Sequence, residues 1–222
     1  MNIEQARFNM IEQQIRPWDV LDQDVLTLLT VVKREAFVPQ AYRALAFSDC
    51  EIPLPDSGKN GECMLTPKVE ARIMQELVIQ KHENVLEIGA GSGYMAALIA
   101  YKARHVTTIE IDPALKELAQ SNLAANGVSN AEVLLGDGIA LATEKAANYD
   151  VIVVSGSVPV IPESLLAQIK VGGRMFIIVG NQPAMTAQII TRNSEVEYST
   201  VGLFETIAKP LRNVPTPSKF KF

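Results

Sequence analysis

The stretch Val85-Leu-Glu-Ile-Gly-Ala-Gly-Ser-Gly-Tyr94 constrains the fold more than any other part of the chain. Its first four residues form a mostly apolar run that predicts a buried strand. Three glycines follow at alternate positions: Gly89, Gly91 and Gly93. The apolar residues 95–100 then predict a helix. A strand, a glycine turn and a helix form the first half of a βαβ unit, which binds nucleotide-like ligands at the carboxyl end of its strand because the glycines let the ligand approach the backbone.

The chain continues as an alternation of strands and helices. Strands are predicted at residues 85–88, 106–111, 131–135, 149–154 and 174–179. Helices are predicted at residues 92–102, 113–126, 139–147 and 162–170. Such βα units build a parallel sheet that is covered on both faces. Residues 188–191 and 198–208 predict a terminal antiparallel hairpin, so the predicted fold class is α/β, with a Rossmann-like, mostly parallel sheet.

A helical segment is predicted before the sheet. Residues 2–16 form an amphipathic pattern that ends before Pro17, and the apolar stripe consists of Ile3, Phe8, Ile11 and Ile15. Asp19 or Asp22 is expected to cap the next helix. Pro67 predicts the first position of a further helix, over residues 68–80.

The chain is expected to be a single domain, residues 1–222, in three parts. Residues 1–80 form the amino-terminal helical part, with a loop at 49–61 that is rich in Pro and Gly. Residues 81–208 form the sheet core. Residues 209–222 form an extended basic tail, which we interpret as a solvated arm because it contains four basic residues, three prolines and no acid.

Composition argues against several classes of protein. A net charge of −5 argues against a general nucleic-acid binder. No apolar run approaches the roughly 20 residues that a membrane span needs. With two histidines, His82 and His105, a multi-histidine metal site is excluded, and no metal is expected. Cys50 and Cys63 lack the spacing of a metal or redox motif, so a cytoplasmic protein with reduced thiols is expected.

The spacing of the glycines indicates which ligand is bound. The dinucleotide pattern G-x-G-x-x-G requires a glycine at the position of Tyr94, where packing is the expected role. An acid, Glu87, stands just before the turn, and an acid is unfavourable beside a pyrophosphate. S-adenosylmethionine carries an ammonium group and no phosphate. The pattern E-x-G-x-G-x-G therefore favours S-adenosylmethionine over a nicotinamide dinucleotide.

Acids also end the next two predicted strands. Glu110 is placed to accept the ribose hydroxyls, and Asp137 lies between two glycines, where it can meet the adenine edge. Each acid also has an alternative role that involves no ligand. Glu87 could be a buried structural carboxylate, Glu110 a solvated strand end, and Asp137 a residue that stabilises a turn. The predicted cofactor-binding residues are Met64, Glu87, Gly89, Ala90, Gly91, Gly93, Glu110, Ile111, Asp137 and Gly138.

Several segments together resemble one family, the protein-L-isoaspartate O-methyltransferases. They are Arg34-Glu-Ala-Phe-Val-Pro39, Ala46-Phe-Ser-Asp49, Val85 to Tyr94, Gly136-Asp-Gly138, Tyr149-Asp-Val-Ile-Val-Val154, Leu166 to Arg174, and Val179-Gly180. The resemblance spans roughly residues 30 to 190. It implies a class I methyltransferase fold and S-adenosylmethionine as cofactor. It also implies the esterification of isoaspartyl carboxylates in damaged proteins or peptides, which is a protein repair reaction.

One segment departs from the family pattern. The family carries a segment like Thr-Ile-Ser-Gln-Pro, whose hydroxyl the resemblance implies to be catalytic. This chain reads Cys63-Met-Leu-Thr-Pro67, so Leu65 stands in the place of the hydroxyl. Thr66 is adjacent, but neighbouring side chains of an extended segment point to opposite faces. The catalytic candidates are therefore Leu65, as a substituted position, and Thr66, and Leu65→Ser is expected to raise activity.

Two other functions remain open from the sequence. The chain could be a family relative with a different methyl acceptor, since Leu65 makes the acceptor side apolar. It could also be a non-catalytic module that binds S-adenosylmethionine and a partner protein. Tyr94 disfavours a nicotinamide dehydrogenase.

Overall fold

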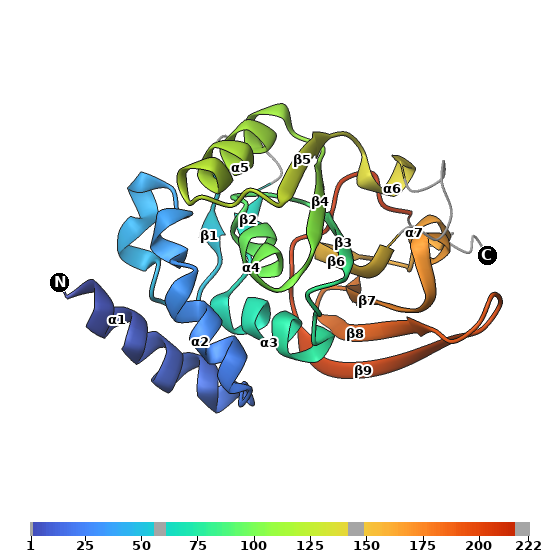
Figure 1. Ribbon diagram of the computed structural model, residues 1–222, viewed down its shortest axis with the longest axis horizontal. Coiled ribbons are helices and arrows are strands. Elements are labelled where there is room, and N and C mark those ends of the chain that lie inside the picture. Colours follow the sequence, from blue (N-terminus) through green and yellow to red (C-terminus); the bar gives the residue numbers. More distant parts are fainter. Residues whose placement is uncertain (1, 56–60, 142–148, 216–222) are drawn as a thin grey trace.

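The computed structural model describes residues 2–55, 61–141 and 149–215. Within these residues seven strands form one sheet in the order β5-β4-β3-β6-β7-β8-β9 (Figure 1). Their bounds are β3 Asn84–Ile88, β4 His105–Glu110, β5 Ala131–Leu135, β6 Tyr149–Val158, β7 Ile169–Asn181, β8 Ala184–Arg192 and β9 Tyr198–Thr206. Strands β3 to β7 pair in parallel, and β8 and β9 form the antiparallel edge. The predicted fold class, including the terminal hairpin, is confirmed.

Helices cover both faces of the parallel part of the sheet. Their bounds are α3 Pro67–Leu77, α4 Tyr94–Lys102, α5 Pro113–Ala125, α6 Gly138–Leu141 and α7 Glu163–Gln168. Successive side chains of a strand point to opposite faces. Val151 and Val153 of β6 therefore pack in the core with α3, α4 and α5, whereas Ile152 and Val154 pack in the core with α7. This alternation explains why the strands are apolar at nearly every position.

The amino-terminal segment packs beside α3 and α4 (Figure 1). It contains α1 Ile3–Met10, a π-helical turn Ile11–Ile15, 3-10 turns at Arg16–Trp18, Arg34–Ala36 and Gln40–Leu45, α2 Gln23–Val31, and two short strands, β1 Ile52–Pro53 and β2 Cys63–Met64. Asp22, rather than Asp19, caps α2, because its side chain accepts hydrogen bonds from the backbone N–H groups of Asp24 and Val25.

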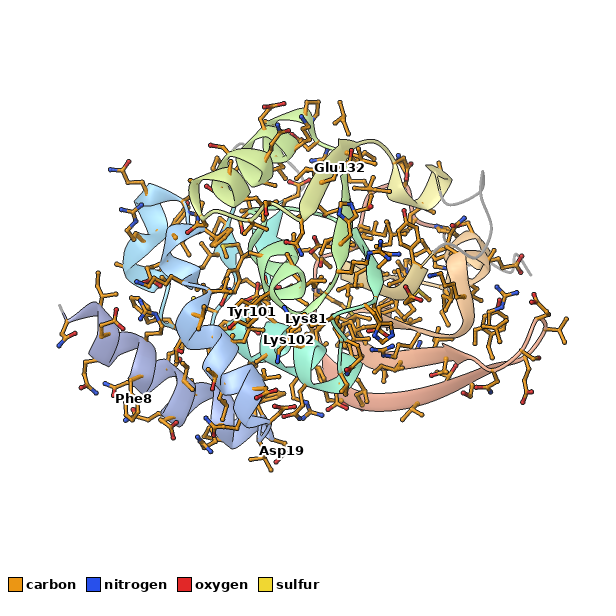
Figure 2. The ribbon with its side chains drawn as sticks, viewed as in Figure 1. Phe8, Asp19, Lys81, Tyr101, Lys102 and Glu132 are labelled. Carbon is orange, nitrogen blue, oxygen red and sulfur yellow. The ribbon has the colours of Figure 1, made fainter. Side chains whose placement is uncertain are left out.

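The predicted stripe of the first helix is only half correct. Ile11 and Ile15 are buried, but Ile3 is 47% exposed and Phe8 is 58% exposed, and Figure 2 shows Phe8 on the outside of α1. The α-helical hydrogen bonding also ends at Met10, and the turns that follow are π-helical and 3-10. Pro17 has no backbone N–H to donate, so a regular α-helix cannot continue through it.

Element boundaries differ from the sequence prediction where neighbours in the sheet decide them. Strand β7 begins at Ile169 because Ile169 pairs with Tyr149, and this pairing ends the predicted helix 162–170 at Gln168. Helix α3 ends at Leu77 because Val78 adopts a left-handed backbone conformation, with φ of 47°. Most of the predicted helix 139–147 and part of the loop 49–61 lie outside the described residues.

Residues 208–213, which we call the strap, lie across the carboxyl end of β6. Ser157 of β6 holds the strap by three hydrogen bonds: its N–H donates to the carbonyl of Lys209 (2.8 Å), its hydroxyl donates to that of Ala208 (2.9 Å), and its carbonyl accepts from the N–H of Leu211 (2.9 Å). The solvated arm expected for the tail is therefore wrong for this part, whereas residues 216–222 lie outside the described chain.

No helix in the described ranges is both long enough and apolar enough to cross a membrane.

Candidate active site

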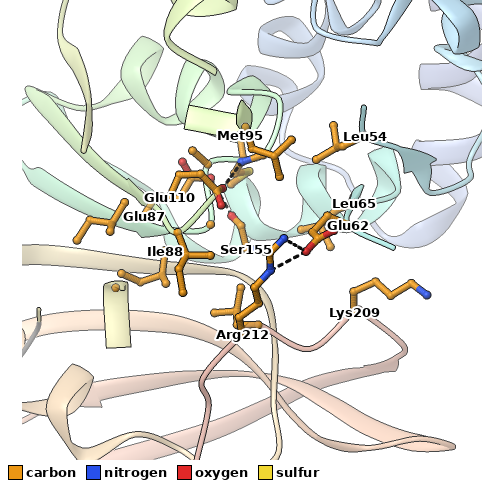
Figure 3. Close-up of a pocket in the computed structure, with 18 of the residues that line it drawn as sticks. Leu54, Glu62, Leu65, Glu87, Ile88, Met95, Glu110, Ser155, Lys209 and Arg212 are labelled. Atoms are coloured by element: carbon orange, nitrogen blue, oxygen red, sulfur yellow. Dashed lines mark hydrogen bonds and ion pairs between the residues drawn. The ribbon is translucent and has the colours of Figure 1, made fainter. Parts of the chain in front are cut away.

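The carboxyl ends of β3, β4 and β6 open into a pocket of about 460 Å³ (Figure 3). Its volume lies in the range of small-molecule binding sites. The pocket brings together every predicted cofactor-binding residue except Gly93: Met64, Glu87, Gly89, Ala90, Gly91, Glu110, Ile111, Asp137 and Gly138. Leu65 also lines it. Thr66 and Gly93 are not among the lining residues.

The glycine turn forms one wall of the pocket. Gly89 and Gly91 have φ values of 91° and 54°, which L side chains rarely adopt. A Cβ on Gly91 would lie 3.2 Å from Leu54 Cδ1, across the pocket wall. The N–H of Gly89 donates to the carbonyl of Ile109 (2.9 Å), so the turn is fixed to β4. The backbone at Gly89 and Gly91 therefore carries no side chain and is fixed in position where a ligand would contact it.

Gly93, the third glycine of the turn, does not line the pocket. Its φ is 82°, and a Cβ there would lie 3.0 Å from the carbonyl oxygen of Ala119 and 3.3 Å from Leu123 Cγ, both on α5. Gly93 therefore lets α4 begin close to α5, outside the pocket. Tyr94 is buried beside Phe37, with ring centroids 5.5 Å apart, which agrees with the packing role expected for it.

Glu87 is a buried carboxyl at the bottom of the pocket. Its two oxygens accept hydrogen bonds from the hydroxyls of Thr108 (2.7 Å) and Ser155 (2.8 Å), on the neighbouring strands β4 and β6. Burial raises the pKa of Glu87 to about 7 even though these hydrogen bonds oppose the shift. Among the described residues no cation pairs with it. A buried carboxyl without a cationic partner suits a ligand that carries a positive group.

Glu110 and Asp137 are fixed by backbone N–H groups at the ends of β4 and β5. Glu110 accepts from Gly91 (2.9 Å) and from Asp112 (3.0 Å), so it links its own strand end to the glycine turn. One oxygen of Asp137, Oδ1, accepts from the N–H groups of the residue pair 139–140 and starts α6. Its other oxygen, Oδ2, accepts from the side chain of Asn213 (2.9 Å), so the strap reaches this edge as well.

Leu65 lies at the other end of the pocket and is 8% exposed. Its carbonyl accepts from the guanidinium of Arg34 (2.9 Å), and Arg34 forms a buried ion pair with Glu70. Burial raises the pKa of Glu70 to about 8 although Arg34 opposes the shift. The hydroxyl of Thr66 is buried and has no hydrogen-bond partner in the described part of the chain. Neighbouring side chains of this extended segment thus face different surroundings, as predicted.

Sequence reasoning missed the strap as a wall of the pocket. Arg212 donates from Nε to Glu62 (2.7 Å) and from Nη2 to Asp112 (3.1 Å), which joins the strap to the segment before β2 and to the end of β4. Figure 3 shows Arg212 below Glu62 and beside Ser155. A Cβ on Gly156 would come within 2.7 Å of Leu211 Cδ2, so the strap packs closely on β6. The basic composition of the tail indicated that it could pair with acids, but Glu62 and Asp112 are distant from it in sequence.

No group of three or more His, Cys, Asp or Glu side chains in the described ranges could hold a metal ion.

Comparisons with known proteins agree on one family. The family model for protein-L-isoaspartate(D-aspartate) O-methyltransferase matches residues 5–211. A protein-L-isoaspartate O-methyltransferase of Rhodopseudomonas palustris is 39% identical over 91% of this chain and 91% of its own length. One from Petrotoga mobilis is 34% identical over 92% of this chain and 96% of its own length.

A solved structure shows the same fold. It is a putative protein-L-isoaspartate O-methyltransferase of Plasmodium falciparum in complex with S-adenosyl-L-homocysteine, with a TM-score of 0.79 and 17% identity, and the match covers 96% of this chain and 99% of that one. The family match extends beyond the segments that carry the sequence resemblance and includes most of the strap. The chain therefore belongs to the protein-L-isoaspartate(D-aspartate) O-methyltransferase family.

Proposed function

We propose that this protein transfers a methyl group from S-adenosylmethionine to the free carboxylate of isoaspartyl residues in proteins or peptides. The observation that carries the proposal is Glu87, a buried carboxyl without a described cationic partner, placed beside a bare glycine turn in a pocket of about 460 Å³. That arrangement suits a nucleoside that carries an ammonium group. Membership of the family supports the acceptor.

The predicted site residues that line the pocket have the following roles in this proposal. Glu87 binds the ammonium group, and the backbone of residues 89–91 lies along the amino-acid arm. Glu110 accepts the two ribose hydroxyls with the lone pairs that Gly91 and Asp112 leave free. Asp137 meets the adenine edge, with Ile111 and Gly138 against the ring. Met64 and Leu65 lie on the side of the methyl acceptor.

The chemistry demands little acid or base from the protein. When bound, S-adenosylmethionine supplies a methyl group activated by sulfonium: a carboxylate oxygen forms the new C–O bond, the S–CH₃ bond breaks, its electron pair stays on sulfur, and no proton moves. The acceptor is already anionic at neutral pH. The residues of this chain therefore act by aligning the acceptor and by excluding water. In this proposal the strap excludes water on one side of the pocket and Leu65 on the other.

A repair role follows from the proposed acceptor. Isoaspartyl residues are a form of protein damage, and the family resemblance implies that esterifying their carboxylate is a repair reaction. We further propose that the protein acts in the cytoplasm, in line with the free thiols of Cys50 and Cys63.

The test is methyl ester formation on two peptides that differ only in an isoaspartyl or a normal aspartyl linkage. The protein is incubated with each peptide and with S-adenosylmethionine labelled in its methyl group, and base-labile label is counted. We expect ester on the isoaspartyl peptide and none above background on its isomer. Equal labelling of both, or of neither, would reject the proposed acceptor.

A further inference from the structure

The backbone around Lys209 is fixed at the wall of the pocket. The carbonyl of Lys209 accepts from the N–H of Ser157 (2.8 Å), and the carbonyl of the preceding residue, Ala208, accepts from the Ser157 hydroxyl (2.9 Å). On the other side, the N–H of Leu211 donates to the carbonyl of Ser157 (2.9 Å). The backbone on both sides of the Lys209 side chain is thus hydrogen-bonded to Ser157 of β6.

The ammonium group of Lys209 is not paired within the described residues. Two cations line the described pocket, Lys209 and Arg212. Arg212 is engaged by Glu62 and Asp112. The Nζ atom of Lys209 forms no hydrogen bond or ion pair with any described residue, and the side chain is exposed. Within the part of the chain that the structure describes, Lys209 is therefore the one unpaired cation of the pocket, and its backbone is fixed by Ser157.

This charge lies at the acceptor end of the pocket. In Figure 3, Lys209 lies below Leu65 and Glu62 and extends away from Glu87 and Glu110. Its Nζ would be 3.7 Å from a Cβ on Gly61, close to β2. Lys209 is also close enough to Cys63 to lower the pKa of its thiol. Burial and the nearby Glu51 oppose this effect and raise that pKa to about 12.

An anionic acceptor needs such a charge here. The carboxyl groups that line the pocket belong to Glu62, Glu70, Glu87, Glu110 and Asp137. Glu62 and Glu70 are paired with arginines, so an isoaspartyl carboxylate would enter against the negative charge of Glu110, Asp137 and ionised Glu87. Leu65 offers no hydrogen-bond donor at the position that the resemblance assigns to a hydroxyl. Arg212 and Arg34 are already occupied by Glu62 and Glu70.

We propose that Lys209 binds the acceptor carboxylate and thereby supplies the anchoring that Leu65 cannot. This inference rests on the proposed function and deepens it, because it identifies the group that selects an anionic acceptor. The ion pair exists before methyl transfer and is lost after it, since the ester is neutral. Lys209 therefore strengthens substrate binding more than it lowers the barrier, and it favours release of the product.

The experiment measures peptide binding by calorimetry to protein saturated with S-adenosylhomocysteine. One peptide carries an isoaspartyl residue, and its matched partner carries the corresponding carboxamide, which has the same shape and no charge. We expect the wild type to prefer the carboxylate by about tenfold, the size of one charge-assisted hydrogen bond. Lys209→Met should remove this preference, and Lys209→Arg should keep most of it. Lys116→Met, which changes a lysine on α5 outside the pocket lining, serves as the matched control.

A separate readout excludes a merely structural effect. The affinity of Lys209→Met for S-adenosylhomocysteine should stay within about twofold of the wild type, because Lys209 extends away from Glu87 and Glu110 (Figure 3). In steady-state assays Lys209→Met should raise KM about tenfold and change kcat much less. An unchanged carboxylate preference in Lys209→Met would overturn the proposal.

The outcomes also separate this inference from the proposed function. If the wild type esterifies the isoaspartyl peptide and Lys209→Met does so with the same KM, the role of Lys209 is wrong and the function stands. If the wild type binds the carboxylate through Lys209 but forms no ester, the function is wrong and the binding role stands. If the wild type neither binds nor esterifies the isoaspartyl peptide, both are overturned.

Discussion

Glu87 is the residue whose protonation state decides what the pocket attracts. Burial raises its pKa to about 7, so at neutral pH the carboxyl is close to half protonated in the free protein. An ammonium group binds the charged carboxylate and not the neutral acid. By linkage, the affinity for such a ligand must rise with pH until the carboxyl is ionised, and then level off.

We therefore expect the affinity for S-adenosylhomocysteine to increase from pH 5.5 toward about 7, roughly tenfold per pH unit at the acid end, and to flatten by pH 8. Glu87→Gln should bind more weakly and lose this dependence. Glu132→Gln, an exposed change on β5 (Figure 2), is the control and should follow the wild type. Calorimetric titrations across this range measure the effect. A flat profile for the wild type would show that Glu87 does not meet the ammonium group.

Leu65 is the second residue of interest, because it affects the expected rate of methyl transfer. It lines the acceptor end but offers only an apolar surface. Leu65→Ser should raise kcat on the isoaspartyl peptide about tenfold, because one hydrogen-bond donor is gained beside the reacting carboxylate. The free energy of unfolding should fall by roughly 1–3 kcal/mol, since a mostly buried apolar side chain is lost. Steady-state kinetics and urea unfolding measure the two effects.

Thr66→Val is the matched control for Leu65→Ser. The hydroxyl of Thr66 is buried without a described partner and is not part of the pocket lining. Its removal should leave kcat unchanged. If Thr66→Val were inactive, Thr66 would hold the role assigned to position 65. If Leu65→Ser were no faster than the wild type, a donor at this position would not limit the reaction.

The residue types of the site could be predicted from the sequence, but their partners could not. Glu87, Glu110 and Asp137 each follow from an acid at a strand end. Thr108 and Ser155, which hold Glu87, become neighbours only through the strand register: Glu87 lies beside Thr108 of β4 and Val153 of β6. Pattern and spacing within one segment carry no information about this register.

The strap forms one wall of the pocket. It is joined to four different parts of the structure: to β6 through Ser157, to the segment before β2 through Glu62, to the end of β4 through Asp112, and to the end of β5 through Asp137. A ligand in the pocket would lie against this wall, and loosening these contacts would weaken its hold on the ligand. The strap should therefore control the rate of dissociation more than the rate of binding.

We expect Arg212→Ala to speed the dissociation of S-adenosylhomocysteine about three- to tenfold. The side chain of Arg212 is 31% exposed, so its ion pairs contribute modestly, and the unfolding free energy should change by less than about 1 kcal/mol. Arg16→Ala, which breaks an ion pair with Glu12 on the amino-terminal segment, is the control. Stopped-flow displacement measures the rate. An unchanged rate would mean that the strap does not retain the ligand.

Helices, strands and turns could be predicted correctly where the residues that determine them are neighbours in the sequence. The glycine turn, the apolar strands and the capping of α2 by Asp22 depend on neighbours in sequence. The strap could not be predicted, because Arg212 meets Glu62 and Asp112 only after the sheet has formed. The start of β7 at Ile169 depends in the same way on its pairing with Tyr149.

For the whole molecule, the order of the strands places the pocket. The chain builds β3, β4 and β5 outward in one direction and then returns to place β6 on the other side of β3. The two helices that leave β3 and β6 therefore cover opposite faces, and a crevice opens at the carboxyl ends of these strands. Gly89, which follows β3, and Ser155, in the second half of β6, both line the pocket. The fold thus provides the cavity, and the acids at the strand ends determine what it binds.

We infer that this cavity binds S-adenosylmethionine through Glu87 and Glu110 and does not bind a dinucleotide. Calorimetric titration of the wild type with S-adenosylhomocysteine and with NAD tests it most directly, with Glu110→Ala as the third sample. We predict binding of S-adenosylhomocysteine, no measurable binding of NAD, and at least a tenfold loss of affinity in a folded Glu110→Ala, because two charge-assisted hydrogen bonds to the ribose are removed. Tighter binding of NAD than of S-adenosylhomocysteine, or an unchanged affinity in Glu110→Ala, would contradict the account.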